Sequence, residues 1–122
     1  MAAKQLNPQV LAFVGDAVHS LYVRTELVLS SDAKAGVLHK RAAAAVRAEA
    51  QSEKIGRLES LLTEEEAEIY RRGRNAKTVN TAKNASVTEY HRATGFEALI
   101  GYLYLTGQRE RMELFLSEDK GE

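Results

Sequence analysis

The chain has 122 residues and a mass of 13.5 kDa, which is enough for one domain with a single core. Lys and Arg together number 17, as do Asp and Glu, so the formal net charge is zero and no overall field marks a nucleic-acid or membrane binder. The lack of Cys excludes disulfides, thiol catalysis and Cys-based zinc sites, and three His are too few for a His-rich metal site.

The sequence predicts the location of the protein through two features that it lacks. No apolar run approaches the roughly 18 residues of a bilayer span, and the first eight residues lack the apolar segment of a secretory signal. We therefore expect a cytoplasmic protein in a reducing compartment, with no membrane partner. An organelle stroma is the alternative if a targeting peptide has been removed from a longer precursor.

The composition predicts an all-α domain, because a single Pro leaves helices uninterrupted and Ala, Leu and Glu are abundant. The first helix is expected over residues 8 to 29. Asn7 is its expected cap, and Pro8 occupies the first turn, where a missing N–H costs nothing.

Three further elements follow in chain order. A second helix begins near residue 35 and runs toward residue 56. A third starts at Thr63, where Thr and the Glu three residues later form an expected capping box, and ends near residue 73. Residues 74 to 86 are expected to form a loop, and a last long helix runs from residue 87 or 88 to about 105.

Charge is distributed in blocks that the zero total conceals. Residues 34 to 57 hold six bases and two acids, residues 58 to 70 hold five acids and no base, and residues 71 to 92 hold six bases and one acid. The two basic blocks would form one positive face if the fold brings them together. The alternative is that they lie on ordinary solvated helices.

Asp16 lies in the middle of the apolar stretch Phe13-Val14-Gly15-Asp16-Ala17-Val18. At 100° per residue it is opposite an apolar stripe and shares its own face with small or apolar residues. This pattern indicates that another part of the protein packs closely on this face. The alternative is that Asp16 is an ordinary solvent-exposed acid. The stripe consists of Val10, Val14, Val18 and Leu21, and the face of Asp16 of Ala12, Ser20 and Val23.

Glu97 has the same kind of position in the last helix, opposite Phe96, Leu99 and Leu103 and between Thr94 and Gly101. Paired carboxylates with few competing charges suit Mg²⁺, which takes one or two carboxylates together with water and phosphate oxygens. Such a site would hydrolyse a phosphodiester. The alternative at this point is a pair of structural acids.

Two motifs resemble those of a known enzyme family. Leu11-Ala-Phe-Val-Gly-Asp-Ala-Val18 resembles the signature helix of the ribonuclease III family, and Phe96-Glu-Ala-Leu-Ile-Gly-Tyr102 resembles its second acidic motif. The similarity to the Mini-III subfamily covers nearly the whole chain. It extends through Asn7-Pro8, Leu38-His39, Ala48 to Gln51, Leu62-Thr-Glu-Glu-Glu66 and Arg71-Arg72-Gly73-Arg74-Asn75-Ala76.

Larger ribonuclease III enzymes carry two more acids, at the positions of Ala12 and Thr94 here. The same reduction resembles Mini-III, so the catalytic and metal-binding roles are assigned to Asp16 and Glu97. The double-stranded-RNA-binding domain of the larger enzymes is also missing. RNA binding would then fall to residues 1 to 122 themselves, as one ribonuclease III-like catalytic domain.

The resemblance implies an all-α fold of about six or seven helices, a symmetric homodimer, and Mg²⁺ as cofactor with Mn²⁺ as a substitute. The small, apolar surroundings of Asp16 also suit a two-fold helix interface. The implied reaction cuts both strands of double-stranded RNA, leaves 5′ phosphate and 3′ hydroxyl ends, and matures large-subunit (23S-type) ribosomal RNA precursors. The alternatives are a non-catalytic RNA-binding or ribosome-associated protein of the same fold, and a helical protein-interaction module.

The basic blocks are the candidate RNA-binding residues, because A-form RNA is recognised mainly through phosphates, 2′-hydroxyls and shape. Ordinary surface charge is the alternative for all of them, and Arg71 has a second alternative as a partner of the preceding glutamates. The first set is Arg71, Arg72, Arg74, Lys77 and Lys83, and the second is His39, Lys40 and Arg47.

Overall fold

The computed structural model describes residues 2 to 76 and 86 to 117, and it confirms the all-α class. Within these ranges there are six α-helices and two short 3₁₀ turns, η1 and η2. In chain order they are η1 (Ala3–Gln5), α1 (Pro8–Ser30), α2 (Ala35–Ala45), α3 (Ala48–Leu58), η2 (Glu59–Leu61), α4 (Glu64–Arg74), α5 (Val87–Leu105) and α6 (Arg109–Leu116).

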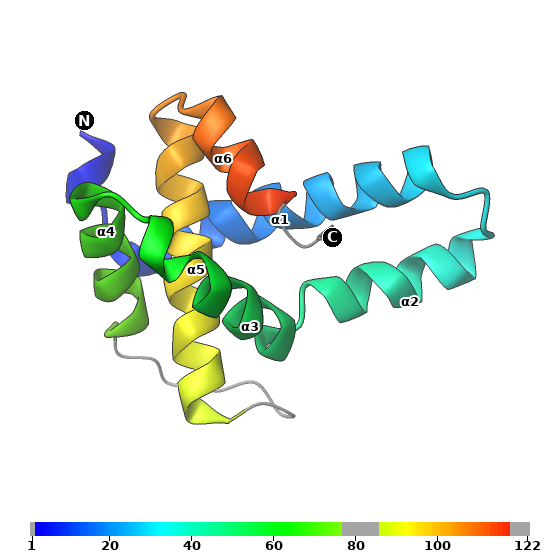
Figure 1. Cartoon of the computed structure of the whole chain (residues 1–122), viewed down its shortest axis with the longest axis horizontal. Coiled ribbons are helices and arrows are strands. Elements are labelled where there is room, and N and C mark those ends of the chain that lie inside the picture. Colours follow the sequence, from blue (N-terminus) through cyan, green and yellow to red (C-terminus); the bar gives the residue numbers. More distant parts are fainter. Residues whose placement is uncertain (1, 77–85, 118–122) are drawn as a thin grey trace.

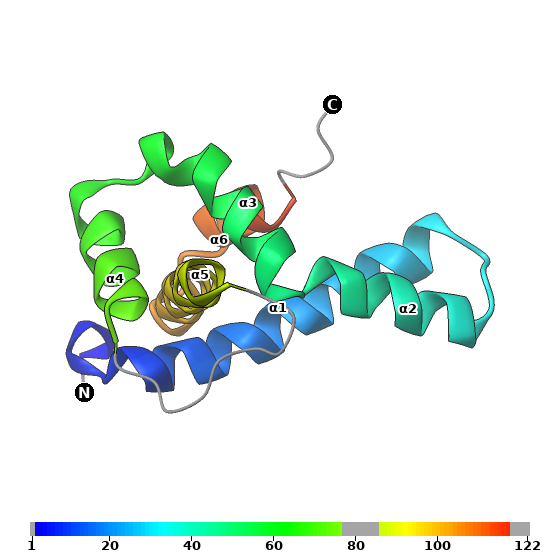
Figure 2. The same ribbon diagram turned by 90° about the horizontal axis from the view of Figure 1, so that it is seen from below.

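The helix α5 forms the centre of the fold. Figure 2 shows it end-on, enclosed by α1, α3 and α4, and ten of its 19 residues are buried. Phe96, Leu99 and Leu103 are fully buried, and each such side chain stabilises the fold by roughly 1.5 to 3 kcal/mol. Packing on all sides therefore fixes the backbone that carries Glu97. No helix in the described ranges is long and apolar enough to cross a membrane.

The second half of α1 and the whole of α2 form an arm that projects away from the other helices (Figures 1 and 2). The arm has little core of its own, since Ala42 is the one buried residue of α2. A groove between two helices can therefore stay open along it.

Three predicted helices are confirmed, and their end signals explain why. Asn7 accepts a hydrogen bond from the backbone N–H of Gln9 at 2.7 Å and caps α1, which begins at Pro8. Thr63 and Glu66 form the expected capping box of α4. Such caps satisfy backbone N–H groups that have no partner inside the helix, so the sequence marks these starts clearly.

The predicted single helix from residue 35 to 56 is wrong, because the chain breaks it into α2 and α3 at Val46 and Arg47. Arg47 has an extended backbone, with φ −62° and ψ 149°. The break turns α3 back onto α5, where Ile55 and Leu58 become fully buried. A continuous helix would hold both side chains out along the arm, so the free energy of burial outweighs local helix propensity.

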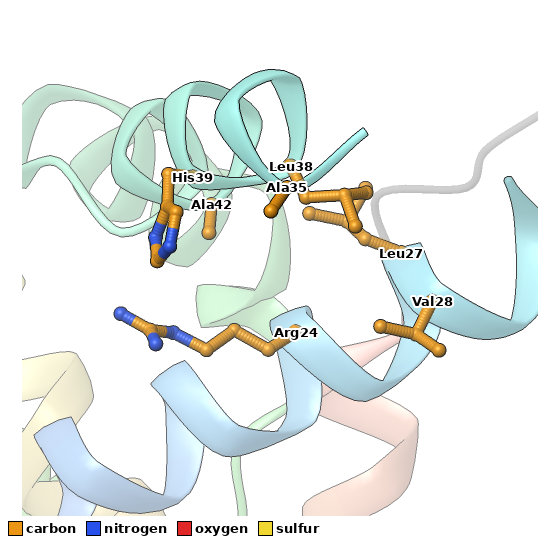
Figure 3. Close-up of a pocket in the computed structure, with 7 residues that line it drawn as sticks. All are labelled: Arg24, Leu27, Val28, Ala35, Leu38, His39 and Ala42. Atoms are coloured by element: carbon orange, nitrogen blue, oxygen red, sulfur yellow. The ribbon is translucent and has the colours of Figure 1, made fainter. Parts of the chain in front are cut away.

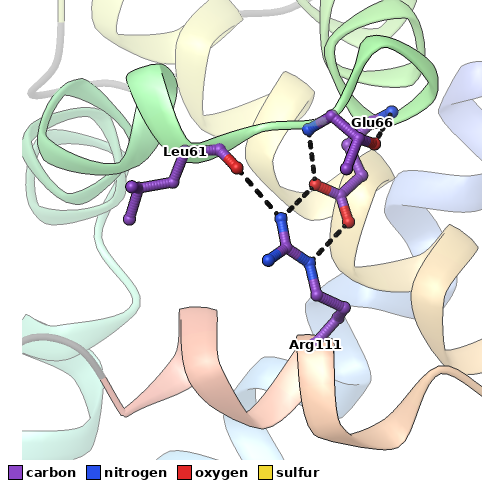
Figure 4. Close-up of polar contacts among 4 residues, drawn as sticks. Leu61, Glu66 and Arg111 are labelled. Carbon is purple, nitrogen blue, oxygen red and sulfur yellow. Dashed lines mark hydrogen bonds and ion pairs between the residues drawn. The ribbon is translucent and has the colours of Figure 1, made fainter.

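The helix α6 was not predicted, and a half-buried ion pair with α4 holds it in place (Figure 4). Arg111 donates to the two carboxylate oxygens of Glu66 at 2.6 and 2.9 Å and to the carbonyl oxygen of Leu61 at 3.0 Å. Burial alone would raise the pKa of Glu66, but the Arg111 hydrogen bond and the Thr63 cap together lower it. Glu66 thus joins the start of α4 to α6.

Candidate active site

Two glycines bring α1 and α5 into backbone contact. A Cβ atom on Gly15 would lie 1.8 Å from the carbonyl oxygen of Glu97, and one on Gly101 would lie 2.0 Å from the carbonyl oxygen of Leu11. Only residues without a side chain can occupy both positions. Because Asp16 follows Gly15 directly, this crossing places Asp16 beside Glu97, as the two small-residue faces predicted.

The buried face of α1 differs from the predicted apolar stripe. Leu11, Ala12, Gly15 and His19 face the core, whereas Val10 and Leu21 of the stripe are 48% and 67% exposed. Because α1 is apolar almost all round, periodicity alone does not identify its inner side, and the glycine contact decides it. The predicted cover of the Asp16 face is therefore partial, since Ala12 is buried and Ser20 and Val23 are half-buried but Asp16 itself is exposed.

Glu97 is held by a glutamine that the sequence analysis did not assign to the site. The side-chain amide of Gln51 donates to Glu97 Oε2 at 3.1 Å and to the carbonyl oxygen of Val46 at 2.6 Å. Gln51 is only 2% exposed, and its Oε1 atom is buried with no hydrogen-bond partner among the described residues. The α2–α3 break makes this possible, because it frees the Val46 carbonyl.

The surroundings of Glu97 favour its protonated form. Burial is the main cause and raises the pKa of Glu97 to about 8, the Gln51 hydrogen bond opposes this, and the charge and hydrogen bonding of Asp16 add to it. Buried acids with strongly shifted pKa values are concentrated at functional sites. The pair is therefore unlike an ordinary structural acid with an Arg partner, of which Glu66 is the example in this chain.

The residues present fit a hard divalent cation. Asp16, Glu97 and the unpartnered Oε1 atom of Gln51 are all oxygen donors, which Mg²⁺ prefers. The described residues contain no group of three or more His, Cys, Asp or Glu side chains that could enclose a metal ion. Two carboxylates leave coordination positions for water and substrate phosphate, as expected for an open Mg²⁺ site.

The raised pKa of Glu97 predicts how stability depends on pH without metal. Its folded-state pKa of about 8 lies above its ordinary value of 4.5, so its stabilising contribution is complete below pH 4.5 and is lost as pH rises through 8. We expect the free energy of unfolding to fall by roughly 4 kcal/mol more in the wild type than in Glu97→Gln between pH 5 and pH 9. Urea unfolding in EDTA measures this, and parallel pH curves for the two proteins would contradict it.

The first set of candidate RNA-binding residues lies at the end of α4. Arg71 is exposed and has no ion pair with the preceding glutamates in the described residues. Arg74 lies over the ring of Tyr70, 5.6 Å from its centroid. Arg72 is engaged inside the chain, since it donates to the carbonyl oxygens of Lys4 at 2.7 Å and Leu6 at 3.0 Å. Lys77 and Lys83 lie outside the described residues.

The second set lies on the other side of the molecule. His39 and Lys40 are exposed on α2, and Arg47 is exposed at the start of α3. Both views place α2 and α4 on opposite sides of α5 (Figures 1 and 2). Arg71 and Arg74 therefore do not share a face with His39 and Lys40 within a single chain, although the two basic blocks do meet where Arg92 of α5 lies against Gly56 of α3.

A sequence signal for Gln51 did exist. Gln51 shares one face of α3 with Ile55 and Leu58, so it is a polar residue in line with two apolar ones. Amides in such positions need buried partners, because an unpaired buried polar group costs roughly 1 to 3 kcal/mol.

The chain is similar in sequence and in fold to known proteins. The family model for the ribonuclease III domain matches residues 9 to 108. The chain is 51% identical over 111 residues to the Mini-ribonuclease 3 of a Thermoanaerobacter species, covering 91% of this chain and 78% of that protein. It is 51% identical over 112 residues to the Mini-ribonuclease 3 of Enterococcus faecalis, covering 90% and 85%. A crystal structure from Fusobacterium nucleatum matches with TM-score 0.85 at 32% identity, covering 93% of this chain and 90% of that one.

Proposed function

Since the chain belongs to the ribonuclease III family, and within it to the Mini-ribonuclease 3 endoribonucleases, we propose that Asp16 and Glu97 bind Mg²⁺ to hydrolyse double-stranded RNA. The observation that carries this proposal is the convergence of the two acids at the glycine crossing of α1 and α5. Glu97 is half-buried, and neither acid has an ion pair with a basic side chain within residues 2 to 76 and 86 to 117. A cation would supply the missing positive charge.

Each residue has a definite task in the proposed reaction. Asp16 and Glu97 provide carboxylate oxygens, and Gln51 fixes the orientation of the Glu97 carboxylate through its amide N–H. When bound, Mg²⁺ would lower the pKa of a water ligand and stabilise negative charge on the phosphate. The water oxygen forms a bond to phosphorus, the bond from phosphorus to the 3′ oxygen breaks, and a proton goes to that oxygen. The products carry a 5′ phosphate and a 3′ hydroxyl.

The cleavage test uses a labelled RNA duplex incubated with Mg²⁺, with Mn²⁺ and with EDTA. We expect both strands to be cut with either cation and neither strand to be cut in EDTA. A precursor of 23S-type ribosomal RNA, the substrate we propose in the cell, should be cut at defined positions. Duplex binding without cleavage in either cation would instead support a non-catalytic RNA-binding protein, and neither binding nor cleavage would support a protein-interaction module.

The candidate RNA-binding residues are part of this proposal. We propose that Arg71 and Arg74 contact phosphates together with Lys77 and Lys83, and that His39, Lys40 and Arg47 contact the duplex from the other side of α5. Arg72 differs from these, because its guanidinium already binds two backbone carbonyls. Its contribution to RNA binding would come through long-range charge.

A homodimer is supported by the uncovered apolar face of α1. Phe13 is 81% exposed and Leu21 67% exposed, far more than large apolar side chains usually are. A groove of about 630 Å³ lies beside them, and Tyr104 and Met112 form part of its far wall. We propose that a second copy covers this face, which brings two sites together for the two RNA strands.

The dimer leads to a mass prediction. At micromolar concentration the wild type should have the mass of a dimer in light scattering, and Leu21→Asp should have that of a monomer, because a charge would be buried without a partner. Leu61→Asp is the matched control, since Leu61 is also exposed (53%) but lies in η2, away from α1. A monomeric wild type that still cuts both strands would contradict the two-site arrangement.

A further inference from the structure

The arm contains a groove between α1 and α2 that the roles assigned so far leave unexplained. It consists of two adjoining hollows, of about 160 and 380 Å³, which share Arg24, His39 and Ala42 in their lining. Figure 3 shows the Arg24 guanidinium from α1 and the His39 ring from α2 extending into the same space. The floor is formed by small or apolar side chains.

The chemistry of the groove suits an anion. Arg24 and His39 are both exposed, and no described residue gives either of them a hydrogen bond or an ion pair. No acidic side chain lines either hollow. A guanidinium offers planar paired donors that match phosphate oxygens, and an imidazole donates at least one N–H in either protonation state. Ala42 and Ala43 let a polymer backbone approach closely.

The position of the groove connects it to the acidic pair. Ser20 and Arg24 follow Asp16 at intervals of four residues, so they continue along the same side of α1. Arg24 is eight residues beyond Asp16, which corresponds to about 12 Å along the helix axis. On the opposite wall, Val46 lines the groove and its carbonyl oxygen accepts from Gln51, which also donates to Glu97.

We propose that the α1–α2 groove is a phosphate subsite, in which Arg24 and His39 bind the backbone of the strand being cut. Since neighbouring phosphates of one A-form strand are about 6 Å apart and the strand rises about 2.8 Å per nucleotide, the phosphate concerned lies roughly two to four nucleotides from the cut. The proposal rests on the proposed function and adds a specific contact to it. The occupant is a phosphodiester, because the groove offers donors and positive charge without a carboxylate.

The test uses a series of RNA duplexes, each with one uncharged methylphosphonate linkage in the cleaved strand. The position of that linkage differs from duplex to duplex, up to six nucleotides on each side of the cut. Affinity is measured in EDTA and cleavage in Mg²⁺. With the natural duplex, Arg24→Gln should bind roughly tenfold more weakly than wild type, because a charge-assisted hydrogen bond is lost. Arg24→Lys keeps the charge and should recover part of this loss. Lys4→Gln removes an equal charge outside the arm and is the matched control.

The decisive result is a position-specific coupling. A methylphosphonate at one position, two to four nucleotides from the cut, should lower the affinity of the wild type about as much as Arg24→Gln does. The same linkage should not lower the affinity of the Arg24→Gln variant any further. His39→Ala should couple to the same linkage, while Lys4→Gln should couple to none near it.

Three outcomes would overturn the proposal. If the wild type cleaves the duplex but no linkage couples to Arg24→Gln, the groove is not a phosphate subsite, whereas the proposed function is unaffected. A change of mass from dimer to monomer in Arg24→Gln shows that a second copy occupies the groove instead. A wild-type protein that neither cuts nor binds the duplex removes the proposed function and the subsite together.

Discussion

Glu97→Gln is expected to abolish RNA cleavage while leaving the fold and RNA binding intact. The amide keeps the shape of the side chain and loses the negative charge that would hold Mg²⁺. A catalytic cation stabilises the transition state by several kcal/mol, so its loss should lower the cleavage rate by about a hundredfold to ten-thousandfold. Stability should not suffer, because burial raises the pKa of Glu97 to about 8 and the side chain at neutral pH is already mostly uncharged.

Asp16→Asn should show the same loss, and single-turnover cleavage in saturating Mg²⁺ measures both variants. Binding to the duplex in EDTA and urea unfolding show whether recognition and folding survive. Glu68→Gln is the matched control, since Glu68 is an exposed acid on α4, far from the pair. If either site variant cleaved at nearly the wild-type rate, that residue would not be a metal ligand.

Gly15→Ala is expected to destabilise the fold by about 3 kcal/mol or more. The new methyl group would lie 1.8 Å from the carbonyl oxygen of Glu97, so α1 and α5 must separate. Overpacking of a well-packed contact typically costs 1 to 3 kcal/mol, and here the obstacle is backbone, which cannot rotate away. Cleavage should fall as well, because the separation that relieves the clash also moves Asp16 away from Glu97.

Gly36→Ala is the control for this substitution. A Cβ at Gly36, in the first turn of α2, would have no atom within 4 Å, so the same change should stabilise the protein by roughly 0.5 to 1 kcal/mol. Circular dichroism and urea unfolding compare the two variants. A Gly15→Ala protein as stable and as active as the wild type would show that the helices do not touch at this point.

The parts of the fold that could be predicted are those with local signals. The start of α1 is marked by Asn7 and Pro8 and that of α4 by its capping box, so their bounds follow from nearby residues. The break at Val46 and Arg47 has no Gly or Pro to mark it. It exists because α3 gains burial against α5, which only the assembled fold supplies.

The candidate site divides in the same way. Asp16 and Glu97 could be proposed from the sequence, because each lies on a small-residue face within a motif. Gln51 could not be assigned, since its link to Glu97 requires the α2–α3 break. Arg24 could not either, because its neighbour His39 is distant in sequence and is brought near only by the α1–α2 turn.

The helix α1 leaves unusually little freedom for sequence change. One side touches the backbone of α5 through Gly15, a second carries Asp16, and a third exposes apolar residues such as Phe13. In most surface helices about half of the positions face water and tolerate almost any residue. Substitutions over residues 10 to 24 of this helix would instead affect the packing against α5, the acidic pair or the proposed dimer interface. Variants with an altered RNA preference are therefore easier to obtain in α2 than in α1.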